Sequence, residues 1–205
     1  MRYLFAILLG YLLGCSSMAF YIGFFKKKDI RTAGSGNLGA SNATVLFGWT
    51  AGVIVALHDI GKSLLAVIIA RWLFPELEYA GAAAGVAAVM GHIFPFYLRF
   101  KGGKGLASYF GLTLALNWRL ALMVAALIIA VTLVTDFISL GAMSTVVFVP
   151  SYMAVTTHNW ILVLILCIGT VVMLCKHWEN AVRIWNHTEI GLRSTARGER
   201  RIDKQ

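Results

Sequence analysis

Seven apolar stretches, each bounded by charged residues, proline, asparagine or glycine, account for most of this 205-residue chain. A helix needs roughly 20 apolar residues to cross the hydrocarbon core of a membrane. Hydrophobic residues make up 59% of the chain and charged residues 13%, which leaves no room for a soluble domain. The pattern predicts an all-α integral membrane protein with about seven transmembrane helices. The stretches cover residues 3–25, 43–74, 79–98, 105–117, 119–134, 137–157 and 160–176.

The chain lacks an internal repeat, a low-complexity tract and a long linker, so we expect a single transmembrane domain over residues 1–205. Residues 191–205 read as a mobile basic tail. The first apolar stretch ends in three lysines, Lys26–Lys28, which favours a retained helix over a cleaved signal peptide.

Lysine and arginine gather in three segments of the sequence. Residues 26–42 carry four, residues 99–104 carry three and residues 176–205 carry seven, so these segments hold 14 of the 18. In a seven-span path they lie on one side of the membrane, which the positive-inside rule makes the cytoplasmic side. The N-terminus is then outside and the C-terminus cytoplasmic. The net charge of +9 is explained by topology and anionic lipid headgroups, and we expect no nucleic acid partner.

Two of the stretches fit a simple span poorly, because residues 43–74 are too long and residues 105–117 too short. The long stretch carries Asp59 and Lys62 near its middle. Ionisable residues at membrane depth usually face the protein interior or water. Two interpretations remain open: a broken or re-entrant segment that brings both residues to a cytoplasmic site, or a buried ion pair that holds two helices together.

A short basic loop separates two of the apolar stretches. Residues 99–105 read Arg-Phe-Lys-Gly-Gly-Lys-Gly. Glycines allow backbone N–H groups to approach an oxyanion closely, and lysines add positive charge. The loop is therefore a candidate anion site, built from Lys101, Gly102, Gly103, Lys104 and Gly105. The alternative is a basic loop that only sets the membrane topology.

Two further polar clusters lie on the same predicted side. Residues 28–42 interleave glycines with small polar side chains, a composition that suits the oxygens of a polyol, phosphate or carbonyl, unless the loop is simply solvated. At the end of the last span, helical spacing places His177 and Asn180 on one face, with Arg183 following. A membrane-interface histidine with snorkelling cations would look similar.

Together these motifs resemble the bacterial PlsY family of glycerol-3-phosphate acyltransferases, over nearly the whole chain and in the same order. The motifs are Gly-Ser-Gly-Asn-Leu-Gly-Ala-Ser-Asn at 34–42, Asp59-x-x-Lys62, His92-x-Phe-Pro, Phe-Lys-Gly-Gly-Lys-Gly at 100–105, Ile-Ser-Leu-Gly at 138–141, and His177-x-x-Asn180 with Glu189. The resemblance implies a seven-span inner-membrane enzyme with a cytoplasmic active site. Such an enzyme transfers an acyl group from acyl phosphate to glycerol 3-phosphate, giving lysophosphatidic acid and phosphate for phospholipid biosynthesis.

The resemblance and the polar clusters together assign the site residues. We expect Ser35, Asn37, His177 and Asn180 to act in catalysis. We expect the substrates to be bound by Arg31, Gly36, Asn42, Lys62, Lys101, Gly102, Gly103, Lys104, Gly105, Ser139, Arg183 and Glu189, with Glu189 acting as a structural partner for a cation such as Arg183 rather than as a base. Beyond the two substrates and membrane lipid, neither a metal, a cofactor nor an obligate protein partner is implied.

The sequence departs from the family pattern where an arginine is usual and Val45 stands instead; Ser63 and His187 also differ. Another cation must then neutralise the acceptor phosphate, and Arg31, Arg99, Lys101 or Arg183 are the candidates. If none does, the acceptor is a different molecule. A membrane anion transporter is the alternative from another functional class, motivated by the charged residues at membrane depth.

None of the five histidines is followed by the His-x-x-x-x-Asp pattern of acyl-CoA-dependent glycerolipid acyltransferases. An acyl phosphate is already activated, and a phosphate group can take the proton of the attacking hydroxyl. We therefore expect the protein mainly to position two anions and to stabilise the carbonyl oxygen.

Overall fold

The computed structural model describes residues 1–193, which form helices joined by loops. Within this range the elements are α1 (Arg2–Cys15), α2 (Met18–Phe25), η1 (Ile30–Thr32), α3 (Ala40–Phe47), α4 (Trp49–Leu73), α5 (Ala80–Ile93), η2 (Phe96–Leu98), α6 (Leu106–Leu116), α7 (Trp118–Thr135), α8 (Ile138–Thr157) and α9 (Trp160–Trp185).

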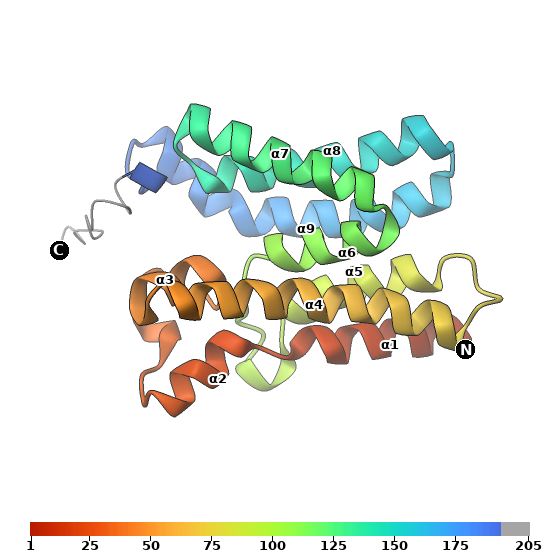
Figure 1. Cartoon of the computed structure of the whole chain (residues 1–205), viewed down its shortest axis with the longest axis horizontal. Coiled ribbons are helices and arrows are strands. Elements are labelled where there is room, and N and C mark those ends of the chain that lie inside the picture. Colours follow the sequence, from red (N-terminus) through yellow and green to blue (C-terminus); the bar gives the residue numbers. More distant parts are fainter. Residues whose placement is uncertain (194–205) are drawn as a thin grey trace.

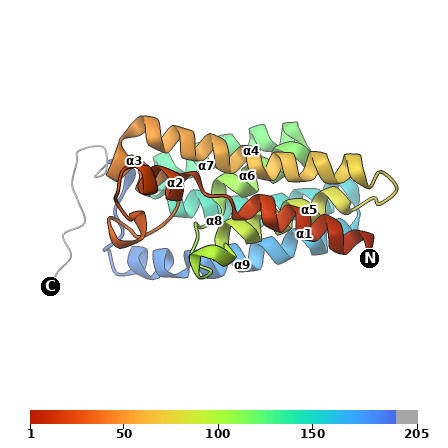
Figure 2. The same cartoon turned by 90° about the horizontal axis from the view of Figure 1, so that it is seen from below.

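The helices form two groups that lie side by side along the long axis (Figure 1). One group contains α1 to α5, in which α1 packs on α5 and α4, and the other contains α7, α8 and α9. Helix α6 joins the groups, because it packs on α4 and α5 and also contacts α7. The turned view in Figure 2 shows the same long helices running nearly parallel. Buried apolar side chains such as Tyr109, Leu112, Leu166 and Met173 fill the space between the groups.

Successive long helices run back and forth between the two ends of the molecule, and α9 ends opposite the start of α1 (Figure 1). Six segments of the described chain are long and apolar enough to span a membrane. They are Arg2–Phe25, Trp49–Leu73, Ala80–Leu98, Trp118–Thr135, Ile138–Thr157 and Trp160–Trp185. The remaining predicted stretch, residues 105–117, corresponds to α6, whose 11 residues are too few for a full crossing. The all-helical membrane fold is confirmed.

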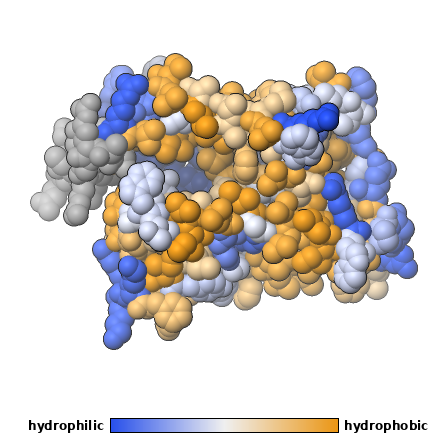
Figure 3. All heavy atoms as spheres, in the orientation of Figure 1, coloured by the Kyte–Doolittle hydropathy of each residue, from blue (hydrophilic) through white to orange (hydrophobic). Residues whose placement is uncertain are grey.

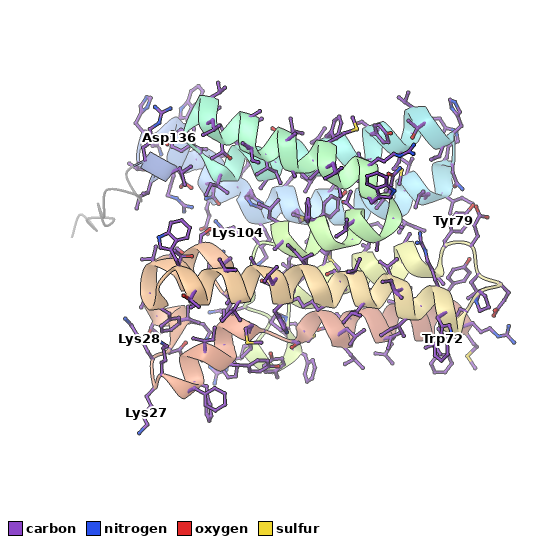
Figure 4. The ribbon with its side chains drawn as sticks, in the orientation of Figure 1. Lys27, Lys28, Trp72, Tyr79, Lys104 and Asp136 are labelled. Carbon is purple, nitrogen blue, oxygen red and sulfur yellow. The ribbon has the colours of Figure 1, made fainter. Side chains whose placement is uncertain are left out.

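The surface matches a membrane protein. Hydrophobic residues cover most of the middle of the face in Figure 3, and hydrophilic residues gather at its two ends. Lys27 and Lys28 lie at one end of the molecule, and Trp72 and Tyr79 lie at the other (Figure 4). An apolar belt between two polar ends is the distribution that a lipid bilayer requires.

The first apolar stretch is broken between α1 and α2, a feature the hydropathy pattern did not reveal. Ser17 caps α2 by accepting a hydrogen bond from the N–H of Phe20 at 3.3 Å. The carbonyl of Cys15 accepts from the Tyr97 hydroxyl at 2.9 Å, and that of Ser16 accepts from Lys62 Nζ at 2.7 Å. These side chains satisfy the carbonyls that the break exposes.

The long stretch over residues 43–74 is interrupted at Gly48, whose φ of 90° ends α3 and starts α4. Helix α4 then continues without a break through Asp59 and Lys62, which form a buried ion pair with an Nζ–Oδ1 distance of 2.7 Å. Lys62 Nζ also lies 2.9 Å from Nδ1 of His92 on α5. The buried-pair interpretation is confirmed, and the ionisable residues do not break the helix.

Candidate active site

A cavity of about 550 Å³ lies where the three polar clusters of the sequence meet. The first loop, the glycine-rich loop and helix α9 each contribute to its wall. Figure 4 shows Lys104 between the two groups of helices, inward of the end that carries Lys27 and Lys28. The lining residues are Ser35, Gly36, Asn37, Phe94, Gly102, Gly103, Lys104, Val171, Val172, Cys175, Lys176 and Glu179.

The first loop is organised by the buried side chain of Asn42, at the start of α3. Its Nδ2 donates to the carbonyls of Ile30, Ala33 and Asn37 at 3.2, 3.2 and 3.0 Å. Its Oδ1 accepts from the N–H of Ser35 at 3.0 Å. All of these contacts go to the loop backbone, so in this structure Asn42 holds the loop in a curved shape, and its predicted contact with substrate stays a prediction.

Two glycines allow this curvature. Gly34 and Gly36 have φ values of 62° and 69°, in the left-handed region that glycine tolerates best. A Cβ on Gly34 would lie 2.1 Å from Oδ1 of Asn42. The result is that Ser35 and Asn37 are presented at the wall of the cavity.

Replacing Asn42 by alanine should loosen this loop. The change leaves three carbonyls and one N–H without their partner, and each buried polar group left unpaired costs roughly 1–3 kcal/mol. We expect faster amide hydrogen exchange across residues 33–38 and weaker binding of both substrates. Replacing the neighbouring, exposed Ser41 by alanine is the matched control. Exchange protection and kinetics equal to those of the control would contradict the role of Asn42.

Arg31 lies in the same loop but points elsewhere. Its guanidinium bonds Asp29 at 2.8 Å, and Asp29 also caps η1 by accepting from the N–H of Arg31. The hydrogen bonds from Arg31 lower the pKa of the Asp29 carboxyl below its usual range. Arg31 is not among the lining residues, so its predicted contact with substrate is not formed in this structure.

The glycine-rich loop packs against the end of α5 through its backbone. The N–H of Gly102 donates to the carbonyl of Ile93 at 3.0 Å, and that of Gly103 donates to His92 at 3.1 Å. These two amides are therefore not presented to an anion in this structure, unlike the prediction for Gly102 and Gly103. Glycine is required for close packing instead, because a Cβ on either residue would lie 2.0 to 2.1 Å from an atom of His92.

The two lysines of this loop differ in position. Lys104 lines the cavity, and its Nζ donates to Oδ1 of Asn180 on α9. Lys101 is exposed and is not among the lining residues, so the structure does not bring it to the site. Gly105, with a φ of 95°, follows Lys104 and starts α6.

The third cluster is a hydrogen-bonded chain that begins at Lys104. Asn180 accepts from Lys104 and donates through Nδ2 to Glu189 Oε1 at 2.5 Å. The other oxygen of Glu189 accepts from Arg183 Nε at 2.6 Å. Glu189 and Arg183 thus form the ion pair that was expected, and the structural role of Glu189 stays a prediction. Both residues act through Asn180 and Lys104 and are not among the residues that line the cavity.

His177 is buried one turn before Asn180. Its Nδ1 lies 2.8 Å from the carbonyl of Met173, so Nδ1 carries a proton and donates it. In the neutral ring, Nε2 is then an acceptor.

Three other predicted regions have different outcomes. Lys62 bonds Asp59, Ser16 and His92 and is not a lining residue, so the structure does not bring it to the cavity. Ser139 is buried at the start of α8, where its hydroxyl has no partner among residues 1–193 and does not line the cavity. Of the predicted tail, residues 191–193 are described: the N–H groups of Leu192 and Arg193 donate to Asp136 at 2.8 and 2.9 Å. The rest of the tail lies outside the described residues.

Sequence reasoning missed Lys176 as a site residue. Its Nζ lies 4.6 Å above the ring of Phe94, and both residues line the cavity. Helical spacing offered a signal, because Lys176 precedes Asn180 by one turn and shares its face.

Comparison with known proteins gives a consistent result. A family model described as glycerol-3-phosphate acyltransferase matches residues 4–187. The glycerol-3-phosphate acyltransferase of Coxiella burnetii (strain CbuG_Q212) is 37% identical over 190 residues, covering 92% of this chain and 97% of the relative.

Two crystal structures of PlsY, an integral membrane glycerol 3-phosphate acyltransferase, share the fold. The glycerol 3-phosphate form aligns with a TM-score of 0.89 at 27% identity, over 96% of this chain and 98% of that one. The lysophosphatidic acid form aligns with a TM-score of 0.85 at 27% identity, over 93% and 95% of the two chains.

Proposed function

The chain belongs to the glycerol-3-phosphate acyltransferase family, and we propose that its cavity transfers an acyl group from acyl phosphate to glycerol 3-phosphate. The products are lysophosphatidic acid and phosphate. One observation carries the proposal: the first loop, the glycine-rich loop and α9, which are far apart in sequence, line a single cavity with serine, asparagine and two lysines. Such a wall suits two phosphorylated substrates.

The chemistry requires positioning more than acid–base catalysis. The acceptor hydroxyl attacks the acyl carbon, the bond from that carbon to the phosphate oxygen breaks, and a phosphate group takes the proton. Lys104 and Lys176 neutralise phosphate charge, while Ser35 and Asn37 hold the reacting oxygens. Asn180 and the Glu189–Arg183 pair hold Lys104 in place.

The active site faces the cytoplasm of a bacterial inner membrane in this proposal. The support is electrostatic: Lys27 and Lys28 lie at one end of the molecule, and α9 ends with Arg183 at that same end (Figures 1 and 4). Basic residues concentrate on the cytoplasmic side of membrane proteins. At the opposite end, the cation Arg2 is paired with Glu76.

A lysine on α9 can supply the positive charge that the family arginine would supply at the position of Val45. Val45 lies on α3 with 53% of its surface exposed, and it is not a lining residue. Of the cations expected to replace the arginine, Arg31 and Arg183 are paired with carboxylates, and Arg99 and Lys101 do not line the cavity. Lys176 does line it, so we assign the compensating charge to Lys176.

Replacing Lys176 by alanine should raise the KM for glycerol 3-phosphate about tenfold or more, because a hydrogen bond between charged groups contributes roughly 1.5–3 kcal/mol. The measurement is steady-state kinetics with each substrate varied in turn, and the KM for acyl phosphate should change less.

The matched test is Val45→Arg in the otherwise unchanged protein. If Lys176 supplies the cation, the added arginine should change kcat/KM for glycerol 3-phosphate by less than about threefold. A rise of about tenfold would show that the cavity lacks a cation and that the chain has drifted to another acceptor.

An acceptor panel tests the function as a whole. Purified protein receives acyl phosphate and, in separate reactions, glycerol 3-phosphate, other phosphorylated polyols or their unphosphorylated forms. Among these acceptors, we expect only glycerol 3-phosphate to give phosphate release and lysophosphatidic acid. We expect no product when acyl-CoA replaces acyl phosphate. Turnover with acyl-CoA but not acyl phosphate would overturn the donor assignment. Anion uptake into proteoliposomes without any chemistry would overturn the enzyme assignment.

A further inference from the structure

A buried polar cluster lies directly behind the glycine-rich loop. It consists of Asp59 and Lys62 on α4, His92 on α5 and the backbone carbonyl of Ser16. All three side chains are buried, with exposed fractions of 2%, 6% and 6%. The reaction proposed above uses none of these groups directly, yet buried ionic groups are costly and call for a physical role.

The contacts of Lys62 determine the protonation of His92. An ammonium group has three protons to donate and cannot accept a hydrogen bond. Its nitrogen has three acceptors: Asp59 Oδ1 at 2.7 Å, the Ser16 carbonyl at 2.7 Å and His92 Nδ1 at 2.9 Å. Nδ1 of His92 also lies 3.3 Å from Asp59 Oδ1, but a proton on Nδ1 would face the nearer Lys62 ammonium, which cannot accept it. Nδ1 therefore accepts from Lys62, and the neutral ring carries its proton on Nε2. The cluster fixes both the tautomer and the orientation of the ring.

The Nε2 side of the ring faces the glycine-rich loop. A Cβ on Gly103 would lie 2.1 Å from Nε2 and 2.6 Å from Cε1 of His92, so the ring fills the space next to this glycine. The carbonyl of His92 accepts from the N–H of Gly103 at 3.1 Å. His92 thus touches Gly103 through both its side chain and its backbone, and the next residue is Lys104.

We propose that His92 is a positioning residue for the glycine-rich loop, held in place by the Asp59–Lys62 pair. The ring supports Gly103 from behind and thereby sets the distance at which Lys104 meets the acceptor phosphate. This inference rests on the proposed function, because it assumes that Lys104 binds that phosphate.

Two substitutions of His92 test separately its contact with Lys62 through Nδ1 and its contact with Gly103 on the Nε2 side. In His92→Asn, the amide oxygen takes the place of Nδ1 and still accepts from Lys62, but the part of the ring next to Gly103 is lost. In His92→Gln, the amide nitrogen takes the place of Nε2 next to Gly103, but Lys62 loses an acceptor. We expect His92→Asn to raise the acceptor KM about tenfold with little change in Tm. We expect His92→Gln to lower Tm and to retain an acceptor KM closer to that of the unchanged protein.

A double-mutant cycle supplies a second, independent readout. Gly103→Ala alone should raise the acceptor KM about tenfold, because the new methyl group collides with the ring and displaces the loop. In the His92→Asn background the methyl group enters the vacated space. The acceptor KM of the double variant should therefore be no higher than that of the single variant with the higher KM. Independent effects would instead multiply to an increase of roughly a hundredfold.

Each outcome decides one question. Two results would overturn the role of His92 and leave the proposed function intact. In the first, the KM increases of His92→Asn and Gly103→Ala multiply in the double variant. In the second, His92→Asn leaves the acceptor KM unchanged while Lys104→Ala raises it. An unchanged acceptor KM in Lys104→Ala as well would overturn the phosphate site itself. If His92→Asn does not fold, His92→Gln combined with Gly103→Ala is measured instead. An acceptor KM at least as high as that of Gly103→Ala alone supports the proposal. An acceptor KM lower than that of Gly103→Ala alone contradicts it.

Discussion

Replacing Ser35 by alanine should lower kcat by roughly 10²–10³-fold, the loss that follows removal of one hydrogen-bond donor to a developing oxyanion. Ser35 lines the cavity, and only its backbone N–H takes part in the contact with Asn42 that shapes the loop. Removing the hydroxyl therefore changes the chemistry of the wall and leaves the loop framework in place. The KM values should change little, since the interaction forms mainly in the transition state.

Single-turnover kinetics with acyl phosphate measure this effect on the chemical step. Ser41→Ala is the matched control, because Ser41 lies in the same polar segment but is exposed and is not a lining residue. A kcat for Ser35→Ala within about twofold of this control would reduce Ser35 to a loop residue.

Replacing Lys104 by alanine should lower kcat/KM for glycerol 3-phosphate by roughly 10- to 150-fold, which corresponds to losing a charged hydrogen bond of about 1.5–3 kcal/mol. The change also removes the donor that Asn180 accepts from, so α9 loses a hydrogen bond to the loop. Most of the loss should appear as a higher KM for the acceptor.

Lys101→Ala provides the comparison within the same loop. Both variants remove one positive charge, but Lys101 is exposed and not a lining residue. Its removal should change the acceptor KM by less than about twofold at physiological ionic strength, where exposed charges are screened. Equal effects of the two substitutions would mean that the loop acts only through its net charge.

Hydropathy and local composition were sufficient to predict the apolar segments that form the long helices and the three polar clusters. Apolar length determines which segments enter the membrane, and the glycines beside Ser35, Asn37 and Lys104 reveal loops that cannot continue as helices. Because the apolar segments alternate in direction, the loops that carry these residues meet at one cavity. This part of the fold follows from rules that act along the chain.

The remaining features depend on partners that are distant in sequence. The break after Cys15 lies within an apolar stretch, and it is stabilised by Lys62 and Tyr97. The amides of Gly102 and Gly103 donate hydrogen bonds to carbonyls at the end of α5, and no local sequence pattern predicts these bonds.

The shortness of α6 has a consequence for how the two substrates meet. Its 11 residues rise about 16 Å, roughly half the thickness of a hydrocarbon core, so α6 covers only part of the length that the long helices cross. Figure 4 shows Lys104 set inward of Lys27 and Lys28. In the proposed orientation, a water-soluble acceptor therefore has to pass the polar end of the molecule to reach Lys104. In that proposal the donor keeps its fatty chain beside the apolar belt during the transfer, and the acylated product is formed there.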